Sequence, residues 1–201
     1  MTDEEIAKFN QNNFATIETN MKDLSTLEPT YDGVKLKEAL IGFEAPKELY
    51  RNGENVPEDY YENIRSNIAS VDVKEQMPLQ YGIITNRTVM KSLPCEEPLS
   101  DAVDDPDWDE LCLACVQVNE PVVCYLRTAD GKFSYIMSEV CQGWIPSEDF
   151  AICRNKEEWR KAQCYEKFIV KRNLFALNLR LTDSFLFTNE TARHVLTELI
   201  I

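Results

Sequence analysis

The chain changes its hydrophobic periodicity at Tyr81, and this change predicts two kinds of structure. Before Tyr81, apolar residues recur mostly at steps of three and four, which is typical of amphipathic helices. From there to Ile152 they form short runs separated by turn residues, which is typical of β-strands. We therefore expect an α+β protein with a helical segment at residues 1–80 and a β-unit at residues 81–152.

Three helices are expected in the first segment. The first begins with Thr2 and Glu5, whose spacing of three is that of a capping box. Its apolar stripe consists of Ile6, Phe9, Phe14, Ile17, Met21 and Leu24. We expect this stripe to pack on the protein's own core rather than on a partner protein. Shorter helices are predicted over residues 34–41 and 57–70.

Short β-type runs follow, and a long polar stretch at residues 94–110 separates the second run from the third. The runs lie at residues 82–85, 88–93, 111–118, 122–127, 132–138, 143–145 and 150–152. So many short strands in about 70 residues favour a small β-barrel.

The last segment, residues 153–201, is net positive, unlike the rest of the chain. Asn155 and Glu158 form a second capping-box pattern, so a short helix is predicted over residues 155–164. Strand-like apolar runs follow at residues 167–171 and 175–179.

The charge balance excludes several classes of function. The net charge of −14 argues against binding to nucleic acid or to anionic lipid surfaces. The chain has no apolar run long enough to span a membrane, and its acidic N-terminus is not a signal peptide. The single histidine, His194, excludes any catalytic or metal site that needs two from this chain. We therefore expect no metal and no cofactor.

The seven cysteines cannot form a complete disulfide set within one chain, because their number is odd. Cys112 and Cys115 have the Cys-x-x-Cys spacing of redox and zinc sites, but they lie in a strand-like run at residues 111–118. We expect buried, reduced thiols that act as small hydrophobic residues, with metal or redox chemistry as the alternative.

The β-unit resembles a bacterial SH3 domain. Four segments carry the resemblance: Tyr81-Gly-Ile-Ile-Thr-Asn-Arg-Thr-Val-Met-Lys-Ser-Leu-Pro94, Asn119-Glu-Pro-Val-Val-Cys-Tyr-Leu126, Ala129-Asp-Gly-Lys-Phe-Ser-Tyr-Ile136 and Gly143-Trp-Ile-Pro146. In this order they are similar to the SH3b1-type domain of multidomain NlpC/p60 peptidases, which cut peptidoglycan stem peptides.

The resemblance implies an arrangement for the whole chain. Residues 81–152 would form the SH3-like barrel, and residues 1–80 a helical clasp around it. Residues 153–201 would supply a linker helix and part of a second SH3-like domain, for which fewer than 40 residues remain after Tyr165.

Catalysis is not expected from this chain. The full-length parent implied by the resemblance is a papain-like cysteine peptidase, in which a cysteine nucleophile is activated by a histidine. The family's Asp-Cys-Ser-Gly motif occurs nowhere in this sequence, and His194 lacks the glycine-rich strand around it. We expect His194 to be an exposed or half-buried surface residue, and the chain to have no catalytic residues.

The resemblance also points to a ligand-binding surface. The acidic stretch at residues 94–110 falls where SH3-like barrels carry a long loop, which in such peptidases lies beside the catalytic cleft and recognises a free amine. A carboxylate is the natural partner of an ammonium group, so Glu96 and Glu97 are the predicted contacts. Aromatic residues at or near the predicted surface complete the site: Trp108, Tyr135 and Trp144.

Each of these predictions has an alternative. Trp144 and Phe133 suit the core of a small barrel at least as well as a ligand surface. For the acidic stretch, the alternative is a simple solvated loop, and the residue pattern taken by itself favours that alternative. Asp105, Asp107 and Asp109 alternate as calcium ligands do, but the glycine and the glutamate that an EF-hand loop requires are missing.

The expected function is recognition of a peptidoglycan stem peptide or muropeptide by the non-catalytic region of an NlpC/p60-type murein endopeptidase. Its partners would be that ligand and the catalytic domain of the parent enzyme. By resemblance the location is the bacterial cell envelope or outside the cell, with the cytoplasm as the alternative. The alternative function is that of an intracellular SH3-like module for protein–protein interaction, which the seven cysteines favour slightly.

Overall fold

A computed structural model describes residues 2–16, 22–44, 48–103 and 108–163 of the 201-residue chain. Residues 1–164 belong to one compact unit, and residues 165–201 make up a second unit. The strands predicted at residues 167–171 and 175–179, the partial second SH3-like domain and His194 lie outside the described residues.

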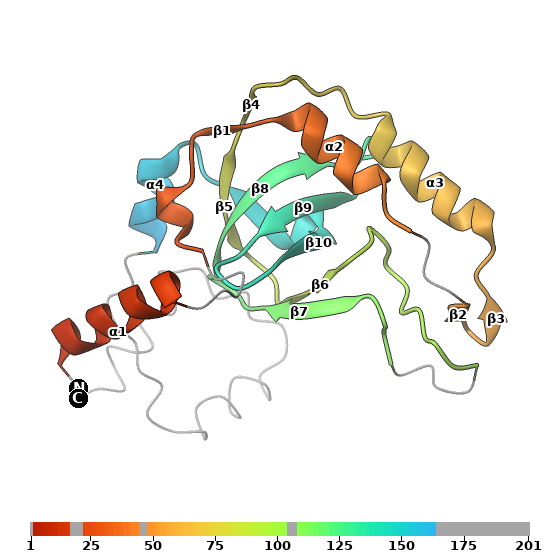
Figure 1. The fold of residues 1–201 in the computed structure, drawn as a ribbon, viewed down its shortest axis with the longest axis horizontal. Coiled ribbons are helices and arrows are strands. Elements are labelled where there is room, and N and C mark those ends of the chain that lie inside the picture. The colour runs from red at the N-terminus through yellow and green to blue at the C-terminus, as the bar shows by residue number, and fades with distance from the viewer. Residues whose placement is uncertain (1, 17–21, 45–47, 104–107, 164–201) are drawn as a thin grey trace, which may run out of the picture. The chain divides into compact units, whose positions relative to one another are not determined.

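The predicted α+β class is confirmed, because four α-helices accompany a seven-stranded antiparallel sheet in the described residues (Figure 1). None of the described helices is long and apolar enough to cross a membrane. The helices are α1 (Asp3–Thr16), α2 (Gly33–Ile41), α3 (Glu58–Ala69) and α4 (Lys156–Ala162), with short 3-10 turns at Leu24–Thr26 and Ser147–Asp149.

Helix α1 begins with the capping box that the sequence predicts. The backbone N–H of Glu5 donates to the Thr2 hydroxyl at 3.2 Å, and the Thr2 N–H donates to the Glu5 carboxylate at 2.7 Å. The expected packing of its stripe is wrong for Ile6 and Phe9, which are 43% and 57% exposed. Helix α1 is described as far as Thr16, and Leu24 lies on a separate 3-10 turn, where it is buried.

Helices α2 and α3 form where they were predicted and pack against each other. The Asp32 carboxylate caps α2 by accepting the Lys35 N–H at 3.0 Å. Helix α3 buries Tyr61, Ile64 and Ile68, which recur at steps of three and four along one face. That face therefore contributes to the hydrophobic core.

The seven predicted β-runs all form strands, and these join one sheet in the order β11-β5-β8-β9-β10-β6-β7. The strands are β5 (Gln80–Ile84), β6 (Thr88–Lys91), β7 (Cys112–Val116), β8 (Pro121–Arg127), β9 (Phe133–Met137), β10 (Gln142–Pro146) and β11 (Phe150–Ile152). No pairing joins β11 to β7 within the described residues. The closed barrel that the sequence predicted is therefore not confirmed.

Both faces of the sheet are buried, as the alternation of side chains along its strands shows. Val122 and Ile136 belong to one core cluster, whereas their neighbours Val123 and Met137 belong to another on the opposite face. The second cluster includes Trp159 of α4, whose indole N–H donates to the Gly82 carbonyl at 3.0 Å. Helices thus cover one face of the sheet. On the other face, side chains from different strands pack against one another.

Two short ladders lie in the helical segment. They are β1 (Thr30–Tyr31) with β4 (Met77–Pro78), and β2 (Tyr50–Arg51) with β3 (Glu54–Asn55). Asn52 and Gly53 join β2 to β3 with φ values of 53° and 81°, as a two-residue hairpin turn requires. Tyr50 exchanges two backbone hydrogen bonds with Ser100, at 2.8 and 3.0 Å. The hairpin is thereby joined to the loop that connects β6 and β7.

Candidate functional site

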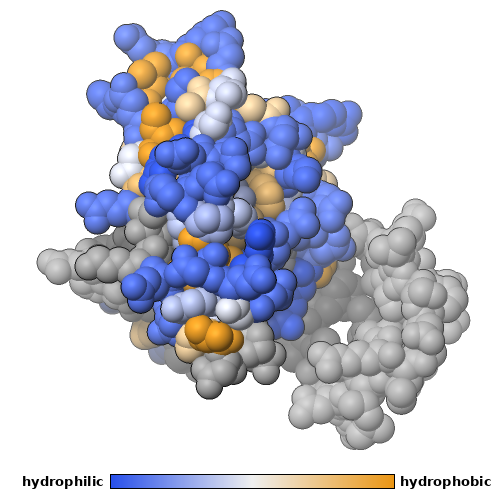
Figure 2. Space-filling view, turned by 90° about the vertical axis from the view of Figure 1, so that its right-hand side faces the viewer, coloured by the Kyte–Doolittle hydropathy of each residue, from blue (hydrophilic) through white to orange (hydrophobic). Residues whose placement is uncertain are grey.

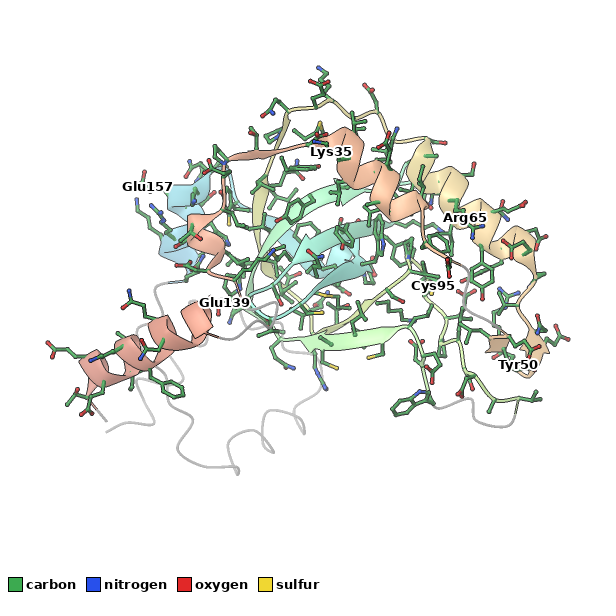
Figure 3. The ribbon with its side chains drawn as sticks, viewed as in Figure 1. Lys35, Tyr50, Arg65, Cys95, Glu139 and Glu157 are labelled. Carbon is green, nitrogen blue, oxygen red and sulfur yellow. The ribbon has the colours of Figure 1, made fainter. Side chains whose placement is uncertain are left out.

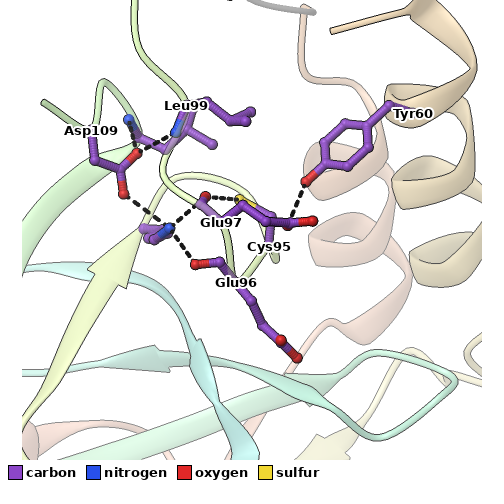
Figure 4. A network of polar contacts seen from close by, with 8 residues as sticks. Tyr60, Cys95, Glu96, Glu97, Leu99 and Asp109 are labelled. Atoms are coloured by element: carbon purple, nitrogen blue, oxygen red, sulfur yellow. Dashed lines mark hydrogen bonds and ion pairs between the residues drawn. The ribbon is translucent and has the colours of Figure 1, made fainter. Parts of the chain in front are cut away.

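The β6–β7 loop, residues 92–111, contains the acidic stretch that the sequence analysis singled out. Lys91, the last residue of β6, holds its first part in place. Figure 4 shows Glu96, Glu97 and Asp109 of this loop and the polar contacts around them. The Lys91 ammonium donates to the carbonyls of Glu96 at 3.1 Å and Glu97 at 2.9 Å, and pairs with the Asp109 carboxylate at 2.9 Å. The two charged side chains are only 11% and 16% exposed. A buried lysine thus neutralises one of the loop's own acidic residues.

Asp109 holds the second part of the loop. Its other carboxylate oxygen accepts the backbone N–H groups of Leu99 at 3.2 Å and Leu111 at 3.1 Å. Lys91 and Asp109 therefore tie both ends of the loop to the end of β6. Asp109, which the sequence also offered as a calcium ligand, has its carboxylate oxygens committed to these contacts.

The Glu97 carboxylate links the loop to the helical segment. It pairs with Arg51 at 3.4 Å and accepts the Tyr60 hydroxyl at 3.3 Å. Burial raises the pKa of Tyr60, and the neighbouring Cys95 and Glu97 raise it further. Tyr60 is therefore a neutral hydrogen-bond donor to Glu97. Cys95 lies in the loop next to α3 (Figure 3).

Two surface pockets meet at Glu96, and together we call them the Glu96 groove. The first, of about 380 Å³, lies between α3, the loop and the β8–β9 turn; its lining is Tyr60, Asn63, Ile64, Asn67, Pro94, Cys95, Glu96, Glu97, Asp130, Lys132 and Phe133. The second, of about 340 Å³, lies over β6 and β10; its lining is Thr88, Val89, Lys91, Cys95, Glu96, Pro98, Asp109, Phe133, Trp144 and Pro146. These volumes fall within the range of small-ligand sites, roughly 300–1,000 Å³.

The structure brings together some of the predicted site residues. Glu96 and Glu97 line the groove with exposed carboxylates, and Trp144 contributes to the wall of the second pocket. The Trp144 ring is only 2% exposed, however, so most of it belongs to the core between the sheet and α3. Its function as a ligand contact stays a prediction.

The other two predicted aromatic residues lie elsewhere. Tyr135 stacks edge-on against Trp144, with ring centroids 5.2 Å apart, and lines a separate pocket beside α2. Trp108 is 60% exposed, and its indole N–H donates to the Glu110 carboxylate at 2.6 Å. It lines neither pocket of the Glu96 groove.

The surface seen in Figure 2 is largely hydrophilic, with small separate hydrophobic patches.

Close packing explains why the residue before Trp144 is a glycine, Gly143. A Cβ at Gly143 would lie 2.7 Å from the Lys91 carbonyl and 2.7 Å from a side-chain carbon of Met90. Strand β10 can approach β6 this closely only without a side chain there. Gly143, the first residue of the Gly143-Trp144 pair, thus has a packing function.

The α3 wall of the groove and the residues that fix its shape were not predicted from the sequence. Tyr60, Asn63 and Asn67 lie at helical spacing on one side of α3, and that pattern could have been noticed. Nothing in the sequence, however, placed this side of the helix opposite Glu96. Lys91 was not predicted as part of the site because a lone lysine within a predicted strand is normally a solvated residue.

The cysteines only partly follow the prediction of buried thiols. Cys95 and Cys124 are buried, whereas Cys112 and Cys115 are exposed, and all six cysteines in the described residues are free. The prediction is wrong for Cys112 and Cys115 because they lie on β7, the last strand in the order of the sheet, which pairs only with β6 within the described residues.

Thiol labelling is expected to separate these two classes. Burial raises the pKa of Cys95 and of Cys124 to about 11, so at pH 8 both are protonated as well as shielded. With a water-soluble disulfide reagent we expect Cys112 and Cys115 to react in the folded protein, and Cys95 and Cys124 only after unfolding. Peptide mass spectrometry after timed quenching measures this. Equal rates for Cys95 and Cys112 would contradict the described burial.

The comparisons with known proteins bear on the fold. No protein-family model and no curated protein matches the sequence. A solved structure of an NlpC/P60 endopeptidase from Photobacterium damselae subsp. piscicida is similar, with a TM-score of 0.51 at 15% sequence identity. The match covers 76% of this chain and 37% of that one, so the chain spans little more than a third of the enzyme's length. At this identity the likeness shows a common fold, and to that extent it confirms the resemblance found in the sequence.

Proposed function

We propose that this chain is a non-catalytic recognition region of a murein endopeptidase of the NlpC/p60 type, and that the Glu96 groove binds the free amine of a peptidoglycan stem peptide. The fold likeness to an NlpC/P60 endopeptidase supports the link to cell-wall hydrolysis. The groove supports the binding function, because Glu96 and Glu97 line a pocket together with the apolar side chains of Ile64, Pro94 and Phe133.

The position of Glu96 is the observation that carries this proposal. Its backbone carbonyl is fixed by Lys91, so the residue is held where the two pockets meet. Its carboxylate is exposed and forms no ion pair within the described residues, whereas the Glu97 carboxylate is engaged by Arg51 and Tyr60. Glu96 is therefore the carboxylate of the groove that is available to an ammonium group.

The proposal extends to the arrangement of the chain. The seven-stranded sheet would be an SH3-like unit, with α2 and α3 as a clasp on one of its faces and α4 as a linker helix towards a second such unit. Catalysis would belong to a catalytic domain of the parent enzyme, and the location would be the cell envelope. The packing of α3 against the loop supports this, since a clasp would then shape the binding groove.

Substitution of Glu96 by glutamine is expected to weaken binding of a free-amine stem peptide by about tenfold, because a charge-assisted hydrogen bond contributes roughly 1.5–3 kcal/mol. Glu97→Gln should have a smaller effect, since Arg51 and Tyr60 already engage that carboxylate. Isothermal titration calorimetry with the free and the N-acetylated peptide measures both effects.

The matched control is Glu28→Gln, which removes the same charge at an exposed position outside the groove. It should bind like the wild type. Equal affinity of the wild-type protein for the free and the acetylated peptide would contradict amine recognition.

The alternative function, an intracellular protein–protein interaction module, has one observation in its favour. The outer edge of β7 is unpaired in the described residues, and Leu113 on this strand is 47% exposed. Such an edge can accept a strand from another protein. Absence of any stem-peptide binding, together with protection of the β7 amides by a protein partner, would favour this alternative.

A further inference from the structure

The β8–β9 turn holds Lys132 at the wall of the Glu96 groove. One oxygen of the Asp130 carboxylate accepts the Thr128 hydroxyl at 2.6 Å and the Lys132 N–H at 3.1 Å. The Lys132 carbonyl accepts the Ser147 N–H at 2.7 Å. Both backbone polar groups of Lys132 are thus bonded, and Gly131 supplies the positive φ of 75° that the turn needs.

Helix α3 holds the same turn from the other side. The Asn67 side-chain carbonyl accepts the Asp130 N–H at 3.1 Å, and the Asn67 backbone carbonyl accepts the Ala129 N–H at 3.2 Å. The turn cannot move away from α3 without losing both bonds. The helix and the turn therefore form a fixed wall of the groove, which faces the wall formed by the β6–β7 loop.

The loop wall carries the negative charges of Glu96 and Glu97, whereas the turn wall carries both a negative charge, Asp130, and a positive one, Lys132. Burial alone would raise the pKa of Asp130, but hydrogen bonds from Thr128, Lys132 and Asn67 outweigh it and lower the pKa. Asp130 is thus an ionised residue whose carboxylate stabilises the β8–β9 turn by accepting hydrogen bonds within it. Lys132 is the one lysine or arginine in the lining of the first pocket, and no ion pair in the described residues includes it. Glu96 on the loop and Lys132 on the turn are thus the two charges that no ion pair or side-chain hydrogen bond engages within the described residues, and the Lys132 charge also helps to lower the pKa of the nearby Asp130.

We propose that the Glu96 groove selects peptides that carry a carboxylate as well as a free amine, with Lys132 binding the carboxylate. This proposal rests on the proposed function, since it assumes that the ammonium group lies at Glu96. Lysine suits this function because its ammonium is a point charge on a flexible stem and can follow a carboxylate on a small ligand. The exposed amide of Asn63, on the α3 wall, is available for the peptide backbone between the two charges.

The test compares two ligands with a free amine on the full chain. One is the stem dipeptide L-alanyl-γ-D-glutamate with both carboxylates free, and the other is its diamide. We expect the wild-type protein to bind the free acid about tenfold more tightly, and Lys132→Met to bind the two ligands within about twofold of each other. Lys132→Arg should restore most of the preference, and Lys74→Met, at an exposed site outside the groove, should keep all of it.

The outcomes separate this proposal from the one on which it rests. If the wild-type protein binds both ligands and Lys132→Met leaves their affinity ratio unchanged, Lys132 does not bind the carboxylate and amine recognition still stands. If neither ligand binds the wild-type protein, the proposed function fails and this inference fails with it. Thermal unfolding of each variant confirms that it is folded, which is expected for substitutions at exposed positions.

Discussion

Replacement of Lys91 by methionine is expected to destabilise the protein by about 3–5 kcal/mol, the usual effect of removing one partner from a buried ion pair. Methionine fills most of the space of the lysine stem but supplies no donor. The Asp109 carboxylate would then be left without its counter-ion at 16% exposure, and the carbonyls of Glu96 and Glu97 would lose their donor. An uncompensated charge in this position is the main cause of the expected loss.

Urea unfolding of the variant gives the free energy of unfolding directly. The matched control is Lys35→Met, which breaks the ion pair with Asp32 at a lysine side chain that is 82% exposed, and should change stability by less than about 1 kcal/mol. The double variant Lys91→Met/Asp109→Leu should recover part of the loss, since it removes the charge that the single variant leaves unpaired. A loss below about 1 kcal/mol for Lys91→Met alone would show that the pair does not hold the loop.

The second large effect is expected at Trp144. Replacing it by alanine should cost about 3–5 kcal/mol, because the ring is 2% exposed and removal of a buried tryptophan leaves a cavity. The ring packs against Tyr135 and lies in the cluster that joins the sheet to α3, so the space cannot be refilled without moving a helix.

Trp108→Ala is the matched control, since it removes the same side chain at a site that is 60% exposed. Its effect on stability should stay within about 0.5 kcal/mol. Thermal and urea unfolding compare the two variants. If Trp144→Ala were as stable as the wild type but lost stem-peptide affinity, the tryptophan would be a ligand contact rather than a core residue.

The fold was predictable from the sequence where a local signal decides the structure. The β-runs after residue 80 form strands because turn residues bound each of them. Helix α4 begins directly after Asn155, because the side chain of this N-cap residue accepts the Glu158 N–H at 2.9 Å. The apolar stripe near the N-terminus was only a partial guide, since periodicity shows which residues share a face of a helix but not what covers that face. Ile6 and Phe9 show this limit.

The candidate site was only half predictable for a related reason. Glu96 and Glu97 were predicted because they follow Pro94 at the entrance of the acidic stretch, where the resemblance implies an amine-binding loop. Their surroundings could not be predicted, since Tyr60 on α3 and Lys132 in the β8–β9 turn reach the groove only through tertiary packing. The net charge of −14 does not show which of the acidic residues are already paired inside the protein. Lys91 neutralises Asp109 internally, so the charge that faces a ligand is set by single residues rather than by the total.

The tie formed by Lys91 and Asp109 has a consequence for protein engineering. Because both ends of the β6–β7 loop are fastened to the end of β6, the length of chain between Ser100 and Asp109 does not determine where Glu96 lies. Lengthening such a closed segment is thermodynamically mild, since each doubling adds only about 0.6 kcal/mol. A fluorophore, an affinity tag or a grafted epitope can therefore be inserted there as a reporter next to the groove, while the groove itself keeps its shape.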